Sequence, residues 1–304
     1  MHCNQHTLSR TFIFRGHGLH TGKPVKMKVG PAPADSGITF LRSDLGDGCR
    51  VAAFAENVTT TTRSTTISSY AFSVVTIEHI MSALTGIGID NALISLDNDE
   101  VPILDGSARL YAEAFSADRL VDQGVPRRYI ALPEAVEVRD EQSGSWVRLE
   151  PSDRPSFDVT VDFGSKVVGI QHAHWDEDVD YAREIAPCRT FVFFHEVEFL
   201  FKNNLIKGGD VDNAIVVVEN PVEPERIEQL AGLLNKPSLK IDANGYLNNL
   251  KLHFPDEIGR HKLLDLIGDI RLTGGFLAAK VTAYKPGHTI NTMAAKAVRK
   301  LLKK

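Results

Sequence analysis

The segment His261-Lys262-Leu263-Leu264-Asp265 places a histidine and an aspartate four residues apart. On a helix, residues at this spacing lie on one face about one turn from each other, so both side chains can bind one ion. Neutral imidazole and carboxylate suit Zn2+, and a catalytic zinc takes three protein ligands with a fourth position for water or substrate. The pair therefore needs a third ligand. The alternative is an amphipathic helix whose His261 and Asp265 only form hydrogen bonds.

The dipeptide Glu78-His79 offers the missing ligand. A carboxylate directly before a ligand histidine also provides a base for water activated by the metal. The alternative is a glutamate that complements the dipole at the start of a helix, next to a polar histidine. The sequence has no H-E-x-x-H motif, which excludes the one-helix arrangement of zinc proteases.

His288 and Asp269 are candidates for proton transfer. His288 follows Lys285-Pro286-Gly287 in a predicted loop, where glycine allows a turn and the close approach of a substrate. Asp269 lies one turn beyond Asp265 on the same helix face, where its carboxylate can orient and charge a nearby imidazole. The alternatives are a polar residue beside a helix for His288 and an ordinary solvated carboxylate for Asp269.

The elements that carry these residues follow the same order twice along the chain. Apolar residues at spacings of three and four predict helices, and short apolar runs predict strands. The predicted order is helix, strand, loop and helix, at residues 75–84, 92–96, 97–107 and 108–117, and again at 259–270, 276–284, 285–288 and 291–302. This weak duplication places His79 and His261 at equivalent helix positions. Two pseudo-symmetric halves are therefore expected to meet at one site.

Strands precede the helices in each half. Short apolar and alternating segments separated by Gly and Pro predict strands near the start of the chain, and a Thr-rich stretch at 58–66 fits a strand and its loop. The turn at residues 124–128 is interpreted as a linker between domains. The strands predicted for the two halves lie at residues 11–14, 25–29 and 37–41, and at 129–138, 146–150 and 156–163.

Composition and charge narrow the class of protein. The 304 residues are 43% hydrophobic and 24% charged, which is typical of a globular chain long enough for two domains. Lys and Arg total 34 against 39 Asp and Glu, a net charge of -5 that argues against nucleic acid as a partner. An anionic ligand must then be held by local cations.

Cysteine usage and hydropathy indicate the compartment. Cys3, Cys49 and Cys188 are odd in number and lack C-x-x-C spacing, so the pattern favours a reducing environment. The first residues lack the pattern of a secretory signal, and apolar runs are far shorter than the roughly 20 residues of a membrane-spanning helix. We therefore expect a cytoplasmic protein without a transmembrane segment.

Taken together, these motifs resemble those of the UDP-3-O-acyl-N-acetylglucosamine deacetylases, the zinc amidases of lipid A biosynthesis in Gram-negative bacteria. The resemblance spans nearly the whole chain, and the order and spacing of the motifs make it specific. The matching segments are Gly18-Leu19-His20-Thr21-Gly22, Pro31 to Ala34, Thr76 to His79, Gly86 to Asn91, Pro102 to Ala108, Arg189-Thr190-Phe191, Arg260-His261-Lys262 and Gly287-His288.

The resemblance implies an α+β fold of two pseudo-symmetric β/α two-layer domains packed helix layer to helix layer, each with a small insert. We place the domains at residues 1–125 and 126–304, with a β-α-β insert near 193–218. That insert would shape a hydrophobic passage for the acyl chain. Its candidate lining residues are Phe193, Phe194, Val197, Phe199, Leu200, Leu205, Ile206 and Ile215. A plain core has the same composition.

The resemblance also assigns roles to the candidate residues. His79, His261 and Asp265 match the zinc ligands, and Glu78 matches the general base toward water that zinc activates. Thr190 matches a hydroxyl that stabilises the oxyanion during attack on the acetamide.

The source of the leaving-group proton stays open. His288 matches a general acid or cationic stabiliser, with Asp269 favouring its charge. A single Glu78 acting as both base and acid is the rival account of the Glu78–His288 pair.

Substrate contacts are implied as well. Lys262 matches a lysine that binds the substrate, and Phe163 and Phe191 match aromatic contacts to it, so the implied substrate is an acylated UDP-sugar. The rivals are a non-catalytic binding protein with the same fold and a phosphotransferase, although the chain lacks a P-loop motif.

The end of the chain leaves two further expectations. Residues 296–304 form the basic end of a predicted amphipathic helix, usually a solvated face, with weak peripheral contact to an anionic membrane as a minor alternative. Some members of the family continue into a fused acyl-carrier-protein dehydratase. The native chain is therefore a candidate to extend beyond Lys304.

Overall fold

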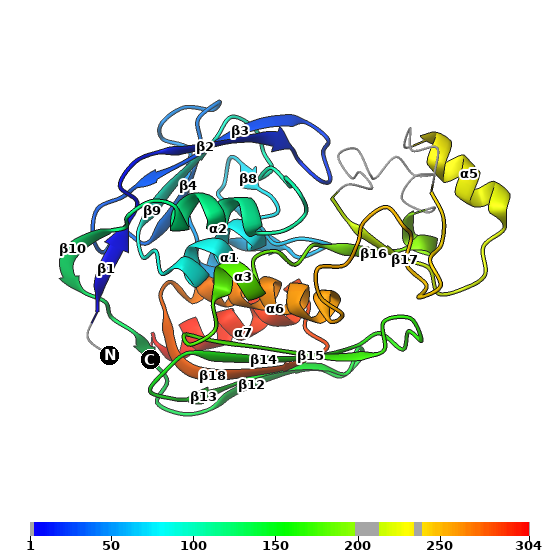
Figure 1. The fold of residues 1–304 in the computed structure, drawn as a ribbon. Helices are drawn as coiled ribbons and strands as arrows, with labels where there is room; N and C mark the ends of the chain where they lie inside the picture. The colour runs from blue at the N-terminus through cyan, green and yellow to red at the C-terminus, as the bar shows by residue number, and fades with distance from the viewer. Residues whose placement is uncertain (1–2, 198–212, 234–238, 304) are drawn as a thin grey trace.

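The computed structural model describes residues 3–197, 213–233 and 239–303. Two β-sheets enclose two layers of helices, and helices from the two halves of the chain face each other in the middle of the molecule (Figure 1). This arrangement confirms the predicted α+β class with helix layer packed on helix layer. Within the described residues, no helix is both long and apolar enough to span a bilayer.

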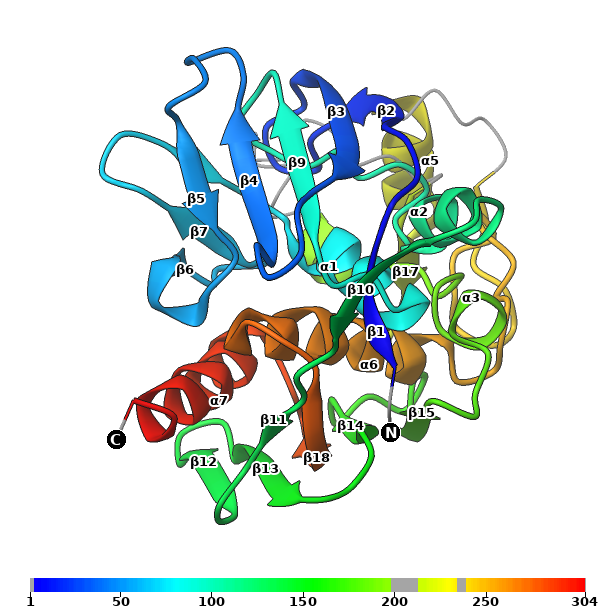
Figure 2. The ribbon, with the colours of Figure 1, turned by 90° about the vertical axis from the view of Figure 1, so that its left-hand side faces the viewer.

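The first half forms a five-stranded sheet covered on one face by helices. Its spatial order is β2-β3-β9-β4-β5, and β9 runs antiparallel to β3 and parallel to β4. Figure 2 shows β5, β4, β9 and β3 side by side. The elements are β2 (Phe12–His17), β3 (Pro24–Pro31), β4 (Ile38–Arg42), β5 (Arg50–Ala52), α1 (Glu78–Ile87), β9 (Ala92–Leu96) and α2 (Arg109–Ser116).

The second half repeats this topology. Its sheet has the order β12-β13-β18-β14-β15, and β18 runs antiparallel to β13 and parallel to β14, as β9 does between β3 and β4. The predicted duplication is therefore present in the strand connections as well as in the helices. The elements are β11 (Ile130–Ala131), which pairs with β18, β12 (Val136–Asp140), β13 (Ser145–Pro151), β14 (Ser156–Asp162), β15 (Ile170–Asp176), α6 (Glu257–Ile270), β18 (Leu277–Tyr284) and α7 (His288–Leu301).

Smaller elements extend both halves. A three-stranded sheet, β6-β7-β8, is the insert of the first half, and the parallel pair β16-β17 belongs to the second; β16, β17 and α5 project from one end of the layers (Figure 1). Their bounds are β6 (Val58–Thr60), β7 (Thr66–Ser68), β8 (Ser73–Val74), β16 (Phe191–Phe193), β17 (Ile215–Val217) and α5 (Pro224–Leu233). The remaining elements are β1 (Asn4–Thr7), η1 (Ala55–Asn57), β10 (Val121–Pro126), α3 (Tyr181–Glu184) and η2 (Arg271–Thr273).

The burial patterns explain the layers. Buried and half-buried residues alternate along β14, as expected for a strand with one face on the core. The helix α6 is buried on nearly all sides because it lies between its own sheet and α1. Polar side chains on α1 and α6 are therefore enclosed together with the apolar core.

Three local expectations are corrected by the structure. The turn expected at residues 124–128 is in part a strand, because β10 pairs with β1 in an antiparallel ladder as far as Pro126, and the role of this segment as a linker stays a prediction. The strand expected at 129–138 is split into β11 and β12 around Pro133, which lacks the N–H that a continuous ladder needs. His288 is the first residue of α7 rather than a loop residue, since the carbonyl of Gly287 already accepts from the N–H of Asn291. The domain boundary at 125/126 stays a prediction.

Gly268 permits the close approach of α6 to α1. A Cβ built at this position would lie 2.1 Å from the carbonyl oxygen of Glu78 and 3.1 Å from the amide nitrogen of Ser82. Gly268→Ala is therefore expected to destabilise the fold by about 1–3 kcal/mol, as overpacking does in cores. Urea unfolding measures this change.

Gly232 provides the matched control, because it lies in α5 and a Cβ there would meet no atom within 4 Å. Gly232→Ala is expected to leave stability unchanged or raise it by up to about 1 kcal/mol, through helix propensity. Equal stability of the Gly268→Ala variant and the wild-type protein would contradict the tight contact.

Candidate metal centre and active site

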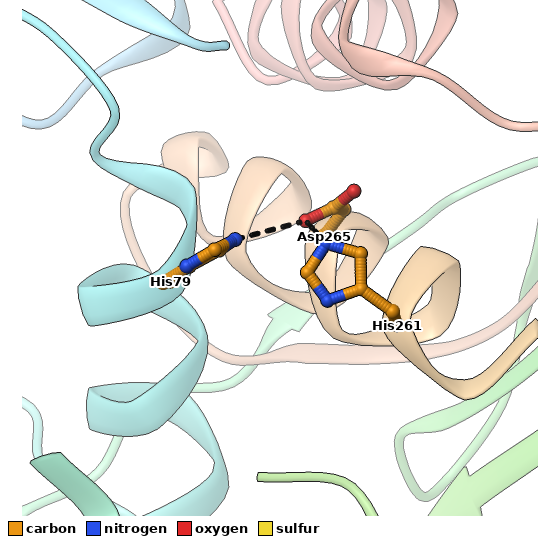
Figure 3. Close-up of side chains that lie close together, drawn as sticks. All are labelled: His79, His261 and Asp265. Carbon is orange, nitrogen blue, oxygen red and sulfur yellow. Dashed lines mark ion pairs between the residues drawn. The ribbon is translucent and has the colours of Figure 1, made fainter. Parts of the chain in front are cut away.

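Three side chains from two facing helices form the candidate metal centre. His79 comes from α1, and His261 and Asp265 come from α6 (Figure 3). Asp265 Oδ1 lies 3.7 Å from His79 Nε2 and 3.5 Å from His261 Nε2. One ligand atom from each residue lies within 4.8 Å of the other two, and all three side chains are buried. The sequence predicted these three residues as ligands, and the structure brings them together.

The chemistry of this group fits a metal ion. Asp265 Oδ1 is buried and has no hydrogen-bond partner among the residues described, which is costly for a carboxylate oxygen. The Nδ1 of His261 faces the carbonyl oxygen of Cys188 at 3.1 Å, which leaves Nε2 free to bind a metal. Two imidazoles and one carboxylate are a set of three protein ligands that a catalytic zinc uses.

The charge states also suit metal binding. Burial lowers the pKa of His79 to about 3 and also lowers the pKa of His261, so both imidazoles are neutral near pH 7. Burial alone would raise the pKa of Asp265, but the positive charges of Lys262 and His288 help to hold that pKa below its usual range. The group therefore presents two neutral nitrogens and one anionic oxygen, the forms in which these residues bind metals.

Glu78 begins α1 and is buried beside this group. Its Oε2 accepts a hydrogen bond from the backbone N–H of Thr65 at 2.9 Å, and its Oε1 lies 4.0 Å from His288 Nε2. Burial raises the pKa of Glu78 to about 7, although the positive charge of His288 acts in the opposite direction. A carboxyl group with this pKa can exchange protons near neutral pH.

His288 and Asp269 form a partly buried pair next to Glu78. Asp269 Oδ2 lies 3.0 Å from His288 Nδ1 and accepts from Asn291 Nδ2 at 3.0 Å, while its Oδ1 accepts from Thr65 Oγ1 at 2.5 Å. Burial alone would lower the pKa of His288, but Asp269 and then Glu78 raise it to about 9. His288 is therefore a cation near neutral pH, positioned next to a carboxyl group that can be a base.

Sequence reasoning missed several supporting groups. Thr65 bonds to both Glu78 and Asp269, yet the Thr-rich segment was interpreted only as a strand and its loop. Asn291 bonds to Asp269, and its position one turn after His288 was the only available signal. The carbonyl of Cys188 orients His261, but backbone groups give no sequence signal.

The predicted substrate contacts lie on one side of the metal centre. The ring of Phe191 stands 6.4 Å from that of His261 and 5.3 Å from that of Phe163, which is 40% exposed. Lys262 Nζ lies 5.9 Å from the centre of the Phe191 ring and 2.5 Å from Asp265 Oδ2. Lys262 therefore neutralises the candidate ligand Asp265, which the sequence did not indicate. The binding roles of Lys262, Phe163 and Phe191 stay predictions.

Thr190 and the insert are described in part. The backbone N–H of Thr190 donates to the carbonyl of Gly106 at 2.8 Å, and the role of its hydroxyl stays a prediction. Of the residues expected to line an acyl passage, Phe194 and Val197 are buried in one apolar cluster, and Ile215 is buried in another that Phe193 packs against. Phe199, Leu200, Leu205 and Ile206 lie outside the described residues. The passage stays a prediction.

Fold and site together define a class of protein in which two β/α units enclose one candidate metal-ligand group of two histidines and an aspartate. The family model for UDP-3-O-acyl N-acetylglycosamine deacetylase (LpxC) matches residues 5–229 and 226–300. The chain belongs to this family. The resemblance predicted from the sequence is confirmed.

Individual relatives agree with this assignment. The chain is 41% identical over 98% of its length to a protein of Porphyromonas gingivalis named bifunctional enzyme LpxC/FabZ, and it covers 65% of that relative. It is 38% identical to proteins of Helicobacter hepaticus and Myxococcus xanthus named UDP-3-O-acyl-N-acetylglucosamine deacetylase, covering 89% and 86% of them. The chain thus spans just under two thirds of the length of the bifunctional relatives and most of the length of the relatives named as deacetylases.

The ligand group predicts metal binding that depends on each of its members. The wild-type chain is expected to bind one zinc ion, and His261→Ala is expected to lose at least about 100-fold in zinc affinity because only two ligands remain. Competition with a chromogenic chelator measures the affinity, and elemental analysis measures the stoichiometry.

His174 is the matched control, because it is a half-exposed histidine on β15 that pairs with Asp158 and Asp176. His174→Ala is expected to bind zinc like the wild-type chain. An equal loss of affinity in both variants would contradict the assigned centre.

Proposed function

We propose that the chain is a zinc-dependent amidase that removes acetate from UDP-3-O-(hydroxyacyl)-N-acetylglucosamine and leaves a free amine, the committed step of lipid A biosynthesis. The observation that carries the proposal is the position of Glu78 and His288 beside the buried group of His79, His261 and Asp265. The names of the Helicobacter and Myxococcus relatives support this substrate. The three free cysteines support action in the cytoplasm.

His79, His261 and Asp265 would hold the zinc. When bound, zinc supplies a Lewis acid that polarises the amide carbonyl and makes water more acidic. Glu78 accepts the proton of the attacking water, and the N–H of Thr65 holds one oxygen of its carboxylate in place. Because burial brings the pKa of Glu78 to about 7, Glu78 is a stronger base than an ordinary carboxylate.

The departing amine needs a proton, and His288 is the group that carries one. Asp269 holds the imidazole through Nδ1, so Nε2 faces the side of Glu78. His288 then donates to the leaving nitrogen, while the hydroxyl of Thr190 donates to the carbonyl oxygen as negative charge develops. In the rival account, Glu78 returns its own proton to the amine, and His288 acts only through its positive charge.

The substrate would be held on the aromatic side of the centre. Phe163 is partly exposed and contacts Phe191, which in turn faces His261, so the two rings provide an apolar wall next to the ligands. Lys262 is the cation proposed to bind the substrate, and its ammonium lies 5.9 Å from the centre of the Phe191 ring in the same wall. A fused dehydratase and weak membrane contact stay predictions. Arg299 of α7 and Lys303, which follows the helix, both pair with Glu56.

Glu78→Gln tests the proposed base. The amide keeps the size of the side chain but cannot accept the proton of water, so acetate release is expected to fall by about 10²–10⁴-fold. Zinc binding is expected to persist because Glu78 is not a proposed ligand. Acetate release within a few-fold of wild type would contradict the assignment of Glu78, and a wild-type chain that binds the acylated UDP-sugar without turnover would favour a non-catalytic binding protein.

His288 is predicted to set the alkaline limb of the pH profile. With a pKa of about 9, His288 is charged below that pH and loses its proton above it, so kcat/KM is expected to fall as pH rises through about 9. His288→Gln is expected to remove this limb and to lower the rate by about 100-fold or more at neutral pH. An unchanged alkaline limb and near wild-type rate would favour the single-Glu78 account.

A further inference from the structure

A buried ion pair lies directly behind the proposed metal ligands. Glu257, fully buried in the first turn of α6, accepts from Arg189 Nε at 2.8 Å, and Arg189 is also buried. Glu257 accepts three further hydrogen bonds, from Arg189 Nη2 at 3.1 Å, from the N–H of Arg189 at 3.1 Å and from the N–H of His253 at 2.6 Å. The buried carboxylate of Glu257 therefore accepts four hydrogen bonds.

These bonds join three segments of the chain. Arg189 Nη2 also donates to the carbonyl oxygen of Lys251 at 2.7 Å, so the pair fastens the segment before β16 and residues 251–253 to the start of α6. A buried ion pair of this kind adds little net stability, because removing both charges from water costs about as much as their attraction returns. Its complete set of hydrogen bonds instead specifies one arrangement of the three segments.

A single peptide group connects the hydrogen bond between the N–H of Arg189 and Glu257 to the metal centre. That N–H and the carbonyl of Cys188 belong to the same peptide unit, which is planar. Glu257 holds the N–H end of this unit, and His261 Nδ1 lies 3.1 Å from the carbonyl oxygen at its other end. Glu257 and His261 are one turn apart on α6, so the peptide bridges the two side chains.

We propose that Glu257 is a positioning residue for the metal centre, acting through Arg189 and the Cys188–Arg189 peptide on the ring of His261. By fixing the direction of the Cys188 carbonyl, Glu257 selects the tautomer with hydrogen on Nδ1 and keeps Nε2 directed at Asp265. The same segment continues into Thr190, the proposed oxyanion donor, and Phe191 of the aromatic wall. Glu257 therefore also fixes the position at which these two residues begin. The inference rests on the zinc site of the proposed function.

Zinc affinity of Glu257→Gln tests the inference. The amide keeps the shape of the side chain but lacks the charge and one of the acceptor oxygens, so the hold on the peptide weakens. We expect the dissociation constant for zinc, measured by chelator competition on metal-free protein, to rise by about 10- to 100-fold. The melting temperature of the metal-free protein, measured in parallel, reports any loss of folded protein.

Asp90→Asn is the matched control. Asp90 and Arg127 form another ion pair with little exposure, in which Asp90 Oδ2 lies 2.7 Å from Arg127 Nη2. Asp90 follows the C-terminal end of α1, whereas His79 lies at the N-terminal end. We expect Asp90→Asn to lower the melting temperature without changing zinc affinity. If Glu257→Gln lowers the melting temperature and binds zinc like the wild-type protein, Glu257 is only structural and the inference is overturned.

Arg189→Lys provides a second variant in case Glu257→Gln does not fold. Lysine keeps the charge but cannot reproduce the paired Nε and Nη2 contacts, so we expect a several-fold rise in the zinc dissociation constant. Unchanged zinc affinity in this variant would also overturn the inference. A wild-type chain that fails to bind zinc would instead contradict the proposed function, so the two failures are distinguishable.

Discussion

The close contact between α1 and α6 is the constraint on which the site depends. It encloses Glu78, His79, His261, Asp265 and Asp269 in the core of the molecule. Burying so many ionisable groups is unfavourable unless each finds a partner or changes its charge state. The structure uses both solutions, since the imidazoles of His79 and His261 become neutral and the carboxylate of Asp269 accepts three hydrogen bonds.

Oδ1 of Asp265 is buried without a hydrogen-bond partner among the residues described and lies 3.7 Å and 3.5 Å from Nε2 of the two imidazoles, so a cation bound there would balance its charge. The repeated topology explains how two halves supply one centre. His79 and His261 occupy equivalent helices, α1 and α6, which follow equivalent strands of the two sheets. The halves differ in what else they contribute: the first provides Glu78, and the second provides Asp265, Asp269 and His288.

The residues before α2 and at the start of α7 form different contacts. Asp105 precedes α2 and pairs with Arg109, whereas His288 begins α7 and reaches Asp269. The duplicated fold therefore fixes where side chains can meet, while the residue types at each position decide what chemistry the meeting allows.

The sequence predicted the parts of the site whose signals are local. Helix periodicity indicated that His261 and Asp265 share one helix face, and the dipeptide Glu78-His79 offered a third candidate ligand. The family resemblance implied that these residues form one metal-ligand group. The family resemblance added the expectation of facing helix layers. Residues that act across the fold were not predictable in this way: Thr65 and Glu257 bond to groups far along the chain, and the carbonyl of Cys188 belongs to the backbone. Likewise, the pairing of β10 with β1 was not predictable, because the two strands lie at opposite ends of the first half.

The central claim is that one zinc ion, held between α1 and α6, enables amide hydrolysis by groups of this chain. The most direct measurement follows acetate release from UDP-3-O-(hydroxyacyl)-N-acetylglucosamine while zinc is returned to metal-free protein. The account predicts no release before zinc is added and a rise in rate that ends near one equivalent per chain. Full activity in the metal-free protein, or no release at any zinc concentration, would contradict it.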